Sequence, residues 1–364
     1  MKRFAWINAL AALGTVFFSC VPDGPLKTNF DRTPMVTTDG WAVSTPSAEG
    51  INPKSINAAY AMIWQENAFF GVKSMLVIRH GKLVAENYCR SADDRYTRAN
   101  VQSTTKCITA IALGMVHADG HLTNLDTPIV NILSSPSGAD SRIKNITLRH
   151  LLTMRSGLSM DNASFTVKLC MDREPDPMGT LLSLPFYANP GDSFVYRDVD
   201  PHILSHILQK TTGRTEAAFV KTRLFDPLGI TNWSWDTDAT GASLGAGGLF
   251  LTARDMGKIG EMILDSGIWA GHRIVPADWI DSMVIPRVKN VPDHSELSYG
   301  FYWWSSPKDS VFSTWGHGGQ FILVDRARNL VLVMTAMPDA GDGPGISLEQ
   351  FLPVYRTLIN GISP

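Results

Sequence analysis

Apolar and β-branched residues dominate two short runs near the beginning of the chain, 73–78 and 83–88. Four residues that include a glycine, 79–82, separate the two runs, which is the pattern of a β-hairpin. A second strand-rich region, 298–335, lies near the other end, where apolar runs alternate with glycine-rich turns. The two regions together predict a sheet assembled from both ends of the chain.

Helical periodicity dominates most of the remaining chain, apart from 120–184, where turn signals prevail. The predicted fold class is α+β, an α/β sandwich in which helices flank an antiparallel sheet. The region over approximately 120–245, whose only predicted regular elements are helices, would form an all-helical subdomain. We expect helices over 53–69, 103–117, 148–154, 201–212, 214–224, 253–264 and 348–359.

The first twenty residues have the pattern of an export signal. Two basic residues precede an apolar stretch, 4–18, and Ser19 and Cys20 follow it. The stretch is too short for a membrane span, which needs about 20 residues. It resembles a bacterial lipoprotein signal with Cys20 as the lipidated residue. We therefore expect a signal peptide over 1–20 and an exported protein, either periplasmic or held at a membrane by a lipid anchor on Cys20.

Composition defines the rest of the chain more broadly. Residues 21–48 are rich in Pro, Thr, Asp and Gly, so we expect a linker before a folded domain over 49–364. The 364 residues are 44% hydrophobic, which predicts a globular protein with a sizeable core. The 32 basic and 34 acidic residues form no run of either sign, which argues against a nucleic-acid partner.

Cysteine spacing gives no sign of a disulfide framework or of a cysteine zinc site. A single bridge, such as Cys89 to Cys170, remains open. Cys107 lies in an apolar run, and we expect it to behave as a small buried apolar residue.

A Ser-x-x-Lys motif, Ser103 to Lys106, stands at the start of the apolar helix. Its i, i+3 spacing places the two side chains on one helix face, about 5–6 Å apart at Cβ, so that the amine can accept the hydroxyl proton. Burial by the apolar run 107–113 would lower the pKa of Lys106 and leave it neutral. Ser141 and Lys144 have the same spacing but lie in a polar loop.

Two other motifs compete with it. The stretch 241–245 reads Gly-x-Ser-x-Gly around Ser243, but it lacks the strand and helix that a nucleophile elbow needs, so we expect a flexible loop. His202 and His206 have the i, i+4 spacing of metal ligands, without an intervening glutamate or an obvious third ligand. We therefore expect no metal site, with one histidine packed and the other solvated.

Several segments share their order with one known family. They are LVIRHGKLV (76–84), STTK (103–106), LLTMRSGL (151–158), a Pro-Gly turn leading to a tyrosine (190–196), LFDPLGI (224–230), GGL with TARD (247–255) and GHGGQ (316–320). In this order they resemble the β-lactamase-related serine hydrolases, which include class C β-lactamases, family VIII carboxylesterases and 6-aminohexanoate-dimer hydrolases. The resemblance implies a β-lactamase/transpeptidase-like fold and acyl transfer through Ser103.

The family has a second motif, Tyr-x-Asn, whose tyrosine exchanges protons with the lysine. The letters occur at 187–189, whereas 196–198 has Asp198 in place of asparagine. We favour Tyr196 over Tyr187, because the family places this tyrosine six residues after the proline of a Pro-Gly turn, here Pro190.

The two motif residues have different electrostatic consequences. A cationic Lys106 beside Tyr196 would lower the pKa of the phenol and let it act as a base. Asp198 would favour a charged Lys106, and it cannot donate an amide N–H to a substrate carbonyl. This departure argues against β-lactam recognition more than against ester cleavage.

The family's third motif, Lys-Thr-Gly, is missing, and the stretch 314–320 stands in its place before an expected strand, 321–325. With Gly316 as the motif glycine, the backbone N–H groups of His317 and Ser103 would hold the oxyanion. With 317–319 as the motif, His317 would replace the lysine and Gln320 would donate. In both registers the lysine that would bind the carboxylate of a β-lactam or a peptide is absent.

The resemblance predicts a serine hydrolase with Ser103, Lys106 and Tyr196 as its catalytic residues and no cofactor. Trp303, Trp304 and Trp315 suggest a partly apolar acyl pocket. We expect a small-molecule ester or amide substrate. The alternatives are a β-lactamase or D,D-peptidase acting on cell-wall-type substrates, and a non-catalytic surface lipoprotein that keeps the fold as a binding domain.

Overall fold

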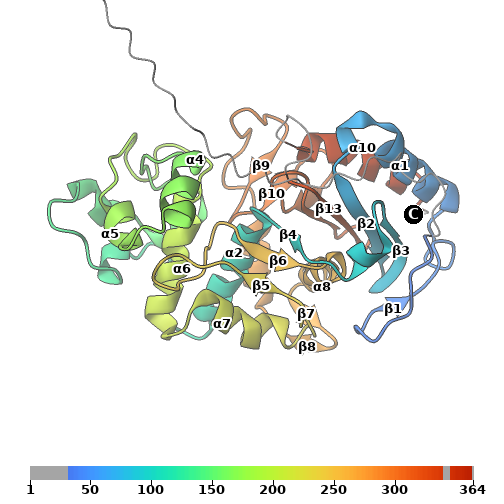
Figure 1. Cartoon of the computed structure of the whole chain (residues 1–364), viewed down its shortest axis with the longest axis horizontal. Helices are drawn as coiled ribbons and strands as arrows, with labels where there is room; N and C mark the ends of the chain where they lie inside the picture. Colours follow the sequence, from blue (N-terminus) through green and yellow to red (C-terminus); the bar gives the residue numbers. More distant parts are fainter. Residues whose placement is uncertain (1–31, 339–344, 363–364) are drawn as a thin grey trace, which may run out of the picture.

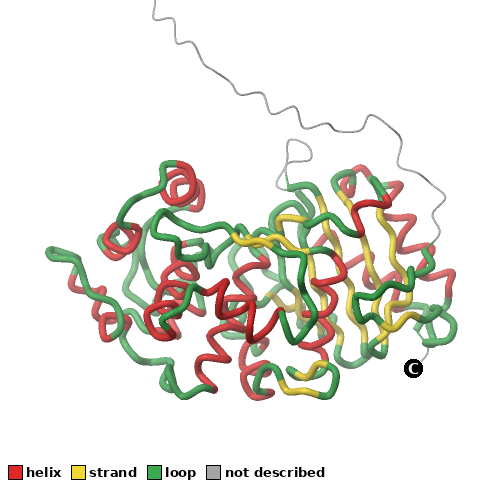
Figure 2. The backbone as a smooth tube through the Cα atoms, turned by 60° about the horizontal axis from the view of Figure 1, so that its bottom comes forward, coloured by secondary structure: helices red, strands yellow, loops and turns green. Residues whose placement is uncertain are grey.

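The computed structural model describes residues 32–338 and 345–362. The expected signal peptide, including Cys20, lies outside these residues. Within them, a lobe built around a sheet adjoins a lobe of mostly short helices (Figures 1 and 2). None of the helices in these two ranges is long and apolar enough to span a membrane.

The main sheet has eight strands drawn from both ends of the chain, as predicted. Its order is β1-β3-β2-β13-β12-β11-β10-β9, and β2 pairs with β13 to join the two ends. β1 and β3 are parallel, and the other neighbours are antiparallel. The bounds are β1 (Ala42–Val43), β2 (Val72–Arg79), β3 (Lys82–Tyr88), β9 (Ser298–Tyr299), β10 (Trp304–Ser306), β11 (Val311–Ser313), β12 (Phe321–Asp325) and β13 (Leu330–Ala336).

Helices cover both faces of this sheet. They are α1 (Pro53–Gln65) and α10 (Leu348–Ile359), which pack together, and α8 (Ala253–Leu264). Successive side chains of a strand point to opposite faces. Phe321 of β12 accordingly stacks on Phe351 of α10, with ring centroids 4.9 Å apart, whereas the neighbouring Ile322 lies under α8. α8 approaches closely because Gly260 has no side chain, and a Cβ there would lie 2.7 Å from Ile322 Cγ2.

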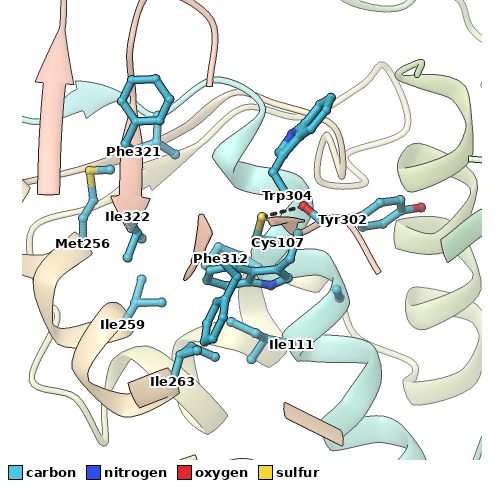
Figure 3. Close-up of a cluster of buried hydrophobic side chains, with 14 of the residues drawn as sticks. Cys107, Ile111, Met256, Ile259, Ile263, Tyr302, Trp304, Phe312, Phe321 and Ile322 are labelled. Carbon is cyan, nitrogen blue, oxygen red and sulfur yellow. Dashed lines mark hydrogen bonds between the residues drawn. The ribbon is translucent and has the colours of Figure 1, made fainter. Parts of the chain in front are cut away.

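The core between α8 and the sheet extends toward α2 (Thr104–Ala118). Met256, Ile259 and Ile263 of α8 line it, and Cys107 and Ile111 enter it from α2 (Figure 3). Cys107 is 1% exposed, and its thiol donates to the Tyr302 carbonyl at 3.0 Å, so it is the small buried residue that was predicted. Cys89, Cys107 and Cys170 are all free thiols, so the bridge that the sequence left open is absent.

The middle of the chain is mainly helical, with differences in detail from the prediction. The predicted helix 214–224 is a short α-helix, α7, that continues as a π-helical turn over Lys221–Phe225, and α4, α5 and α9 were not predicted. The region is not all helical, because β5 pairs with β6 in a small sheet that also contains β4. The bounds are α3 (Leu148–Leu152), α4 (Asn162–Phe165), α5 (Pro177–Leu182), α6 (Val199–Thr212), α7 (Glu216–Val220), α9 (Ala277–Val284), β4 (Ala99–Asn100), β5 (Ser234–Trp235) and β6 (Leu249–Leu251); β7 (Ile268–Trp269) and β8 (His272–Arg273) form a hairpin.

The residues just before the domain are packed on it. Trp41 is 6% exposed, and its indole N–H donates to the Arg254 carbonyl at 3.2 Å. The Arg254 guanidinium in turn pairs with Asp39 at 2.8 Å and with Glu86 at 2.7 Å. Asp39 and Trp41 are thus packed on the domain, where Asp39 supplies a partner that the buried Arg254 needs. The expected linker, 21–48, therefore does not include these residues.

Candidate active site

Ser103 is the N-cap residue of α2, where the two lobes meet. Gln102 before it has a φ of +52°, an uncommon conformation for a residue with a side chain. Lys106 follows one turn later, and its Nζ donates to Ser103 Oγ at 2.6 Å and to the Ala246 carbonyl at 3.0 Å. The Lys106 side chain is only 1% exposed. The predicted spacing thus brings an amine and a hydroxyl into direct contact.

Asp198, the N-cap residue of α6, forms an ion pair with this amine, with 2.7 Å between Lys106 Nζ and Oδ1. Burial disfavours the charge on Lys106, but Asp198 and Tyr196 outweigh it and raise the pKa of Lys106 above its ordinary value. The lowering of this pKa that the apolar helix predicted is therefore wrong, whereas the expectation that Asp198 favours a charged Lys106 agrees with the ion pair. The amine is an ammonium at rest.

Tyr196 lies over the same amine, with Lys106 Nζ 5.0 Å from the ring centroid. Desolvation raises the pKa of Tyr196, although Lys106 and a hydrogen bond with Ser103 oppose the rise. The predicted lowering of this pKa is thus wrong, and the phenol is neutral at rest. The alternative, Tyr187, is 39% exposed and donates to the Ser193 carbonyl at 3.3 Å.

The glycine-rich turn at 316–320 packs against the start of α2. A Cβ on Gly316 would lie 2.3 Å from the Val101 carbonyl oxygen, so this position excludes any side chain. Gln320 is fully buried, and its backbone N–H donates to the Gly316 carbonyl at 3.1 Å. Among the described residues, no hydrogen bond uses the backbone N–H of Ser103 or of His317. The geometry therefore favours the register in which Gly316 is the motif glycine.

A pocket of about 600 Å³ opens beside Ser103. Tyr196, Trp304, Trp315 and His317 line it, as predicted, whereas Trp303 is buried in the core against Phe312. The sequence did not indicate the rest of the wall, which comes from loops without periodicity and from a short helix: Asn162, Phe194, Val195, Val291, Pro292, Asp293 and His294.

His294 is the most connected of these unpredicted residues. Its Nδ1 lies 2.7 Å from Glu349 Oε1, and its ring meets the rings of Trp304 and Trp315 edge-on, with centroids 5.5 and 4.9 Å apart. The nearby aromatic positions were the only signal in the sequence. A loop thus completes the aromatic wall with His294, and Glu349 at the start of α10 holds that ring in place.

Comparison with known proteins identifies the family. The family model described as Beta-lactamase matches residues 59–346. The chain belongs to the beta-lactamase family. It is 26% identical over 179 residues to a 6-aminohexanoate-dimer hydrolase from Paenarthrobacter ureafaciens, and the match spans about half of each protein, 46% of this chain and 46% of the relative.

Two solved structures share the fold of this beta-lactamase family member. A putative 6-aminohexanoate-dimer hydrolase from Bacillus anthracis has a TM-score of 0.69 and 19% identity, with 91% of this chain and 86% of that chain covered. A family VIII carboxylesterase has a TM-score of 0.67 and 14% identity, with 92% and 100% covered. The predicted β-lactamase/transpeptidase-like fold is confirmed.

The rival nucleophiles lie elsewhere in this family member. Ser243 is fully buried, and its Oγ accepts the Ala217 N–H at 2.9 Å. The loop around Ser243 is therefore packed, and the prediction of a flexible loop is wrong. Ser141 and Lys144 are both exposed on a 3₁₀ turn. Neither serine is among the residues that line the pocket.

His202 and His206 also lie outside the pocket lining. Both point Nε2 at Asp238 Oδ2, at 3.2 and 2.7 Å. His202 is fully buried and the His206 side chain is 13% exposed, so the predicted solvated histidine is wrong. Asp238 is a third candidate ligand, which the sequence did not reveal because 32 residues separate it from His206.

Proposed function

We propose that the protein is a serine hydrolase that cleaves an ester or amide bond of a small substrate through an acyl-enzyme on Ser103. The observation that carries the proposal is the 2.6 Å contact between Lys106 Nζ and Ser103 Oγ, at a hydroxyl that lines the pocket. A serine is a weak nucleophile by itself, and an adjacent amine that can take its proton activates it.

Asp198 is the group that can take a proton from the charged Lys106. The ammonium has to release a proton before it can accept one from Ser103, and Asp198 Oδ1 is 2.7 Å away. A substrate that displaces water from the pocket weakens the solvation of the ion pair, which favours transfer of the proton to Asp198. The neutral amine then removes the Ser103 proton while Oγ attacks the carbonyl carbon.

The carbonyl oxygen gains the electron pair of its π bond in this step. The backbone N–H groups of Ser103 and His317, which have no hydrogen-bond partner in the described part of the chain, are the donors that can hold the oxyanion. Collapse of the intermediate breaks the bond to the leaving group, which takes the Tyr196 phenol proton, and Lys106 returns a proton to the phenolate. Water attacks the acyl-enzyme through the same groups in the reverse order, and Ser103 leaves with its proton.

The pocket wall supports an apolar acyl group as the substrate feature. Trp304, Trp315 and Phe194 supply aromatic surface, and the motif lysine that would bind a carboxylate is absent. Asp198 adds negative charge where the family's asparagine would donate an N–H. These features favour an uncharged ester or amide over a β-lactam or a cell-wall peptide.

Labelling with a fluorophosphonate probe tests the nucleophile. The wild-type protein and Ser243→Ala are expected to be labelled, and Ser103→Ala is expected to lose the label while it keeps the wild-type circular dichroism spectrum. Labelling that survives in Ser103→Ala and vanishes in Ser243→Ala contradicts the assignment. A panel of p-nitrophenyl esters, nitrocefin and a D-Ala-D-Ala peptide tests the substrate class, and rapid nitrocefin turnover would reject the ester preference.

We also propose that the protein is exported and carries a lipid on Cys20. The pattern of the first twenty residues supports this. In a bacterial host, metabolic labelling with a fatty-acid analogue is expected to mark the full chain and not Cys20→Ser. Equal labelling of the two proteins, or none of either, contradicts the anchor.

A further inference from the structure

A second group of buried polar side chains lies away from the pocket. His202 and His206 are one turn apart on α6, and both direct Nε2 at a single oxygen, Asp238 Oδ2. The two imidazole rings are 5.0 Å apart and nearly perpendicular, at 86°. The three ligand atoms lie within 4.8 Å of one another. Two imidazoles and a carboxylate thus converge on one point.

The surrounding contacts hold Asp238 in place and leave one of its oxygens to the histidines. Oδ1 accepts three hydrogen bonds, from the Thr240 N–H at 2.8 Å, the Thr240 hydroxyl at 2.7 Å and the Ala242 N–H at 3.1 Å. His202 is fully buried, yet neither of its ring nitrogens has a well-aligned hydrogen bond within the described ranges. A buried imidazole in that state costs free energy unless another partner is present.

We propose that His202, His206 and Asp238 bind a divalent transition-metal ion, preferably zinc, through the two Nε2 atoms and Oδ2. Imidazole nitrogen and carboxylate oxygen are common zinc ligands, and at tetrahedral angles they lie about 3.3 Å apart. His202 Nε2 already lies 3.2 Å from Oδ2, and His206 Nε2, now at 2.7 Å, would have to move away by about half an ångström to reach the same spacing. Asp238 balances one of the two positive charges, and the fourth position is left for water.

The ion would position catalytic groups and would not touch substrate. It would clamp α6 to the loop that contains Asp238. α6 begins after Asp198, the ion-pair partner of Lys106, and the same loop leads to Ala246, whose carbonyl accepts from Lys106 at 3.0 Å. Two of the polar partners of the Lys106 amine, Asp198 and the Ala246 carbonyl, therefore lie next to the two segments that the ion would join. Zinc binding itself does not depend on the proposed hydrolase function.

Metal content tests the site directly. Untagged protein is stripped with a chelator, dialysed against zinc and then against metal-free buffer, and analysed by plasma mass spectrometry. We expect one zinc per chain in the wild type and an increase in melting temperature upon zinc addition. With cobalt, we expect the visible absorption bands of a tetrahedral site.

Two variants separate a metal site from a hydrogen-bonded cluster. His206→Gln keeps an N–H donor for Asp238 but removes the imidazole, and it is expected to lose the zinc and the thermal shift. His272→Gln changes an exposed histidine on β8 and is expected to retain both. If the wild type retains no more zinc than folded His206→Gln, the cluster is a hydrogen-bonded one and the proposal is wrong.

Discussion

Two lysines of this protein are almost equally buried, and they lie beside different cavities. Lys106 of α2 and Lys258 of α8 are each 1% exposed. Lys106 contacts a carboxylate at 2.7 Å and a backbone carbonyl at 3.0 Å, and for Lys258 both distances are 3.1 Å. The cavity beside Lys258 is the larger one, about 900 Å³ against 600 Å³. Burial, ion pairing and cavity size therefore do not distinguish the two sites.

The remaining neighbours do distinguish them. Lys258 pairs with Asp255 of its own helix, three residues earlier. Lys106 pairs with a carboxylate from the other lobe, and it also contacts the Ser103 hydroxyl and the Tyr196 ring. One lysine pairs within its own helix, whereas the other joins a hydroxyl, a phenol and a carboxylate beside a pocket. The two sites therefore differ in the groups that contact the amine.

Exchanging each lysine for methionine is the strongest test of the difference between the two sites. Lys106→Met removes the amine that we propose as the base, and we expect kcat/KM for an activated ester to fall by about 1000-fold or more. Lys258→Met is the matched control, with activity per folded molecule close to that of the wild type. It leaves the buried Asp255 unpaired, so its free energy of unfolding should fall by about 3 kcal/mol in urea titrations. A similar loss of activity in both variants contradicts the distinction.

Tyr196→Phe tests the proton donor beside Lys106. The variant keeps the ring but loses the phenol proton, and we expect kcat/KM to fall by about 100-fold. The loss should be smaller for substrates with good leaving groups, because these need less protonation. Tyr187→Phe should behave like the wild type, and an equal effect of the two substitutions in the same ester assay would reject the role of Tyr196.

Asp198→Asn tests the proton route. Asp198 helps to raise the pKa of Lys106, so an enzyme that released this proton to solvent would need alkaline pH. Transfer to Asp198 avoids that need, and the acid limb of the wild-type profile should then follow protonation of the pair. In Asp198→Asn the amine titrates alone, so the limb should move to higher pH, with kcat/KM at pH 7 reduced by about tenfold. A shift to lower pH shows that Asp198 only stabilises the ammonium.

Glu261→Gln tests the protonation state of Glu261, which lines the larger cavity. Burial and the charge of Asp265 raise the pKa of Glu261 to about 7. The folded state therefore holds this proton more tightly than the unfolded state does, and stability is lost as the pH rises through the range from the ordinary glutamate pKa to about 7. Glu261→Gln should weaken that pH dependence in urea titrations and leave the ester activity unchanged. An unaltered pH dependence would contradict the protonated state of Glu261.

Local patterns were sufficient for much of the fold. The hairpin of β2 and β3 and the helix α10 occur where alternation and periodicity predicted them, and β12 has the predicted bounds. The π-helical turn after α7 was not predictable from periodicity, because its apolar spacing is close to that of an α-helix. Trp41 was missed because its burial depends on Arg254, far away in the sequence.

The contacts of the site also divide into those that local sequence patterns predicted and those that they did not. Ser103 and Lys106 are one helical turn apart, so their contact follows from spacing alone. The charge on Lys106 depends on Asp198, which approaches from the other lobe, and the neutral Tyr196 depends on its tertiary surroundings. His294 reaches the pocket from a loop without a pattern. The contact within one helix followed from spacing and the effect of Asp198 on Lys106 from the family motif, whereas the desolvation of Tyr196 and the position of His294 could not be predicted.

Mass spectrometry of the intact protein after reaction with an activated ester of slow turnover tests the central claim most directly. The wild type should gain the mass of one acyl group, and peptide mapping should place it on Ser103. Ser103→Ala, with an unchanged circular dichroism spectrum, should gain nothing. An adduct on another residue, or no adduct across a range of activated esters and β-lactams, would contradict an acyl-enzyme on Ser103.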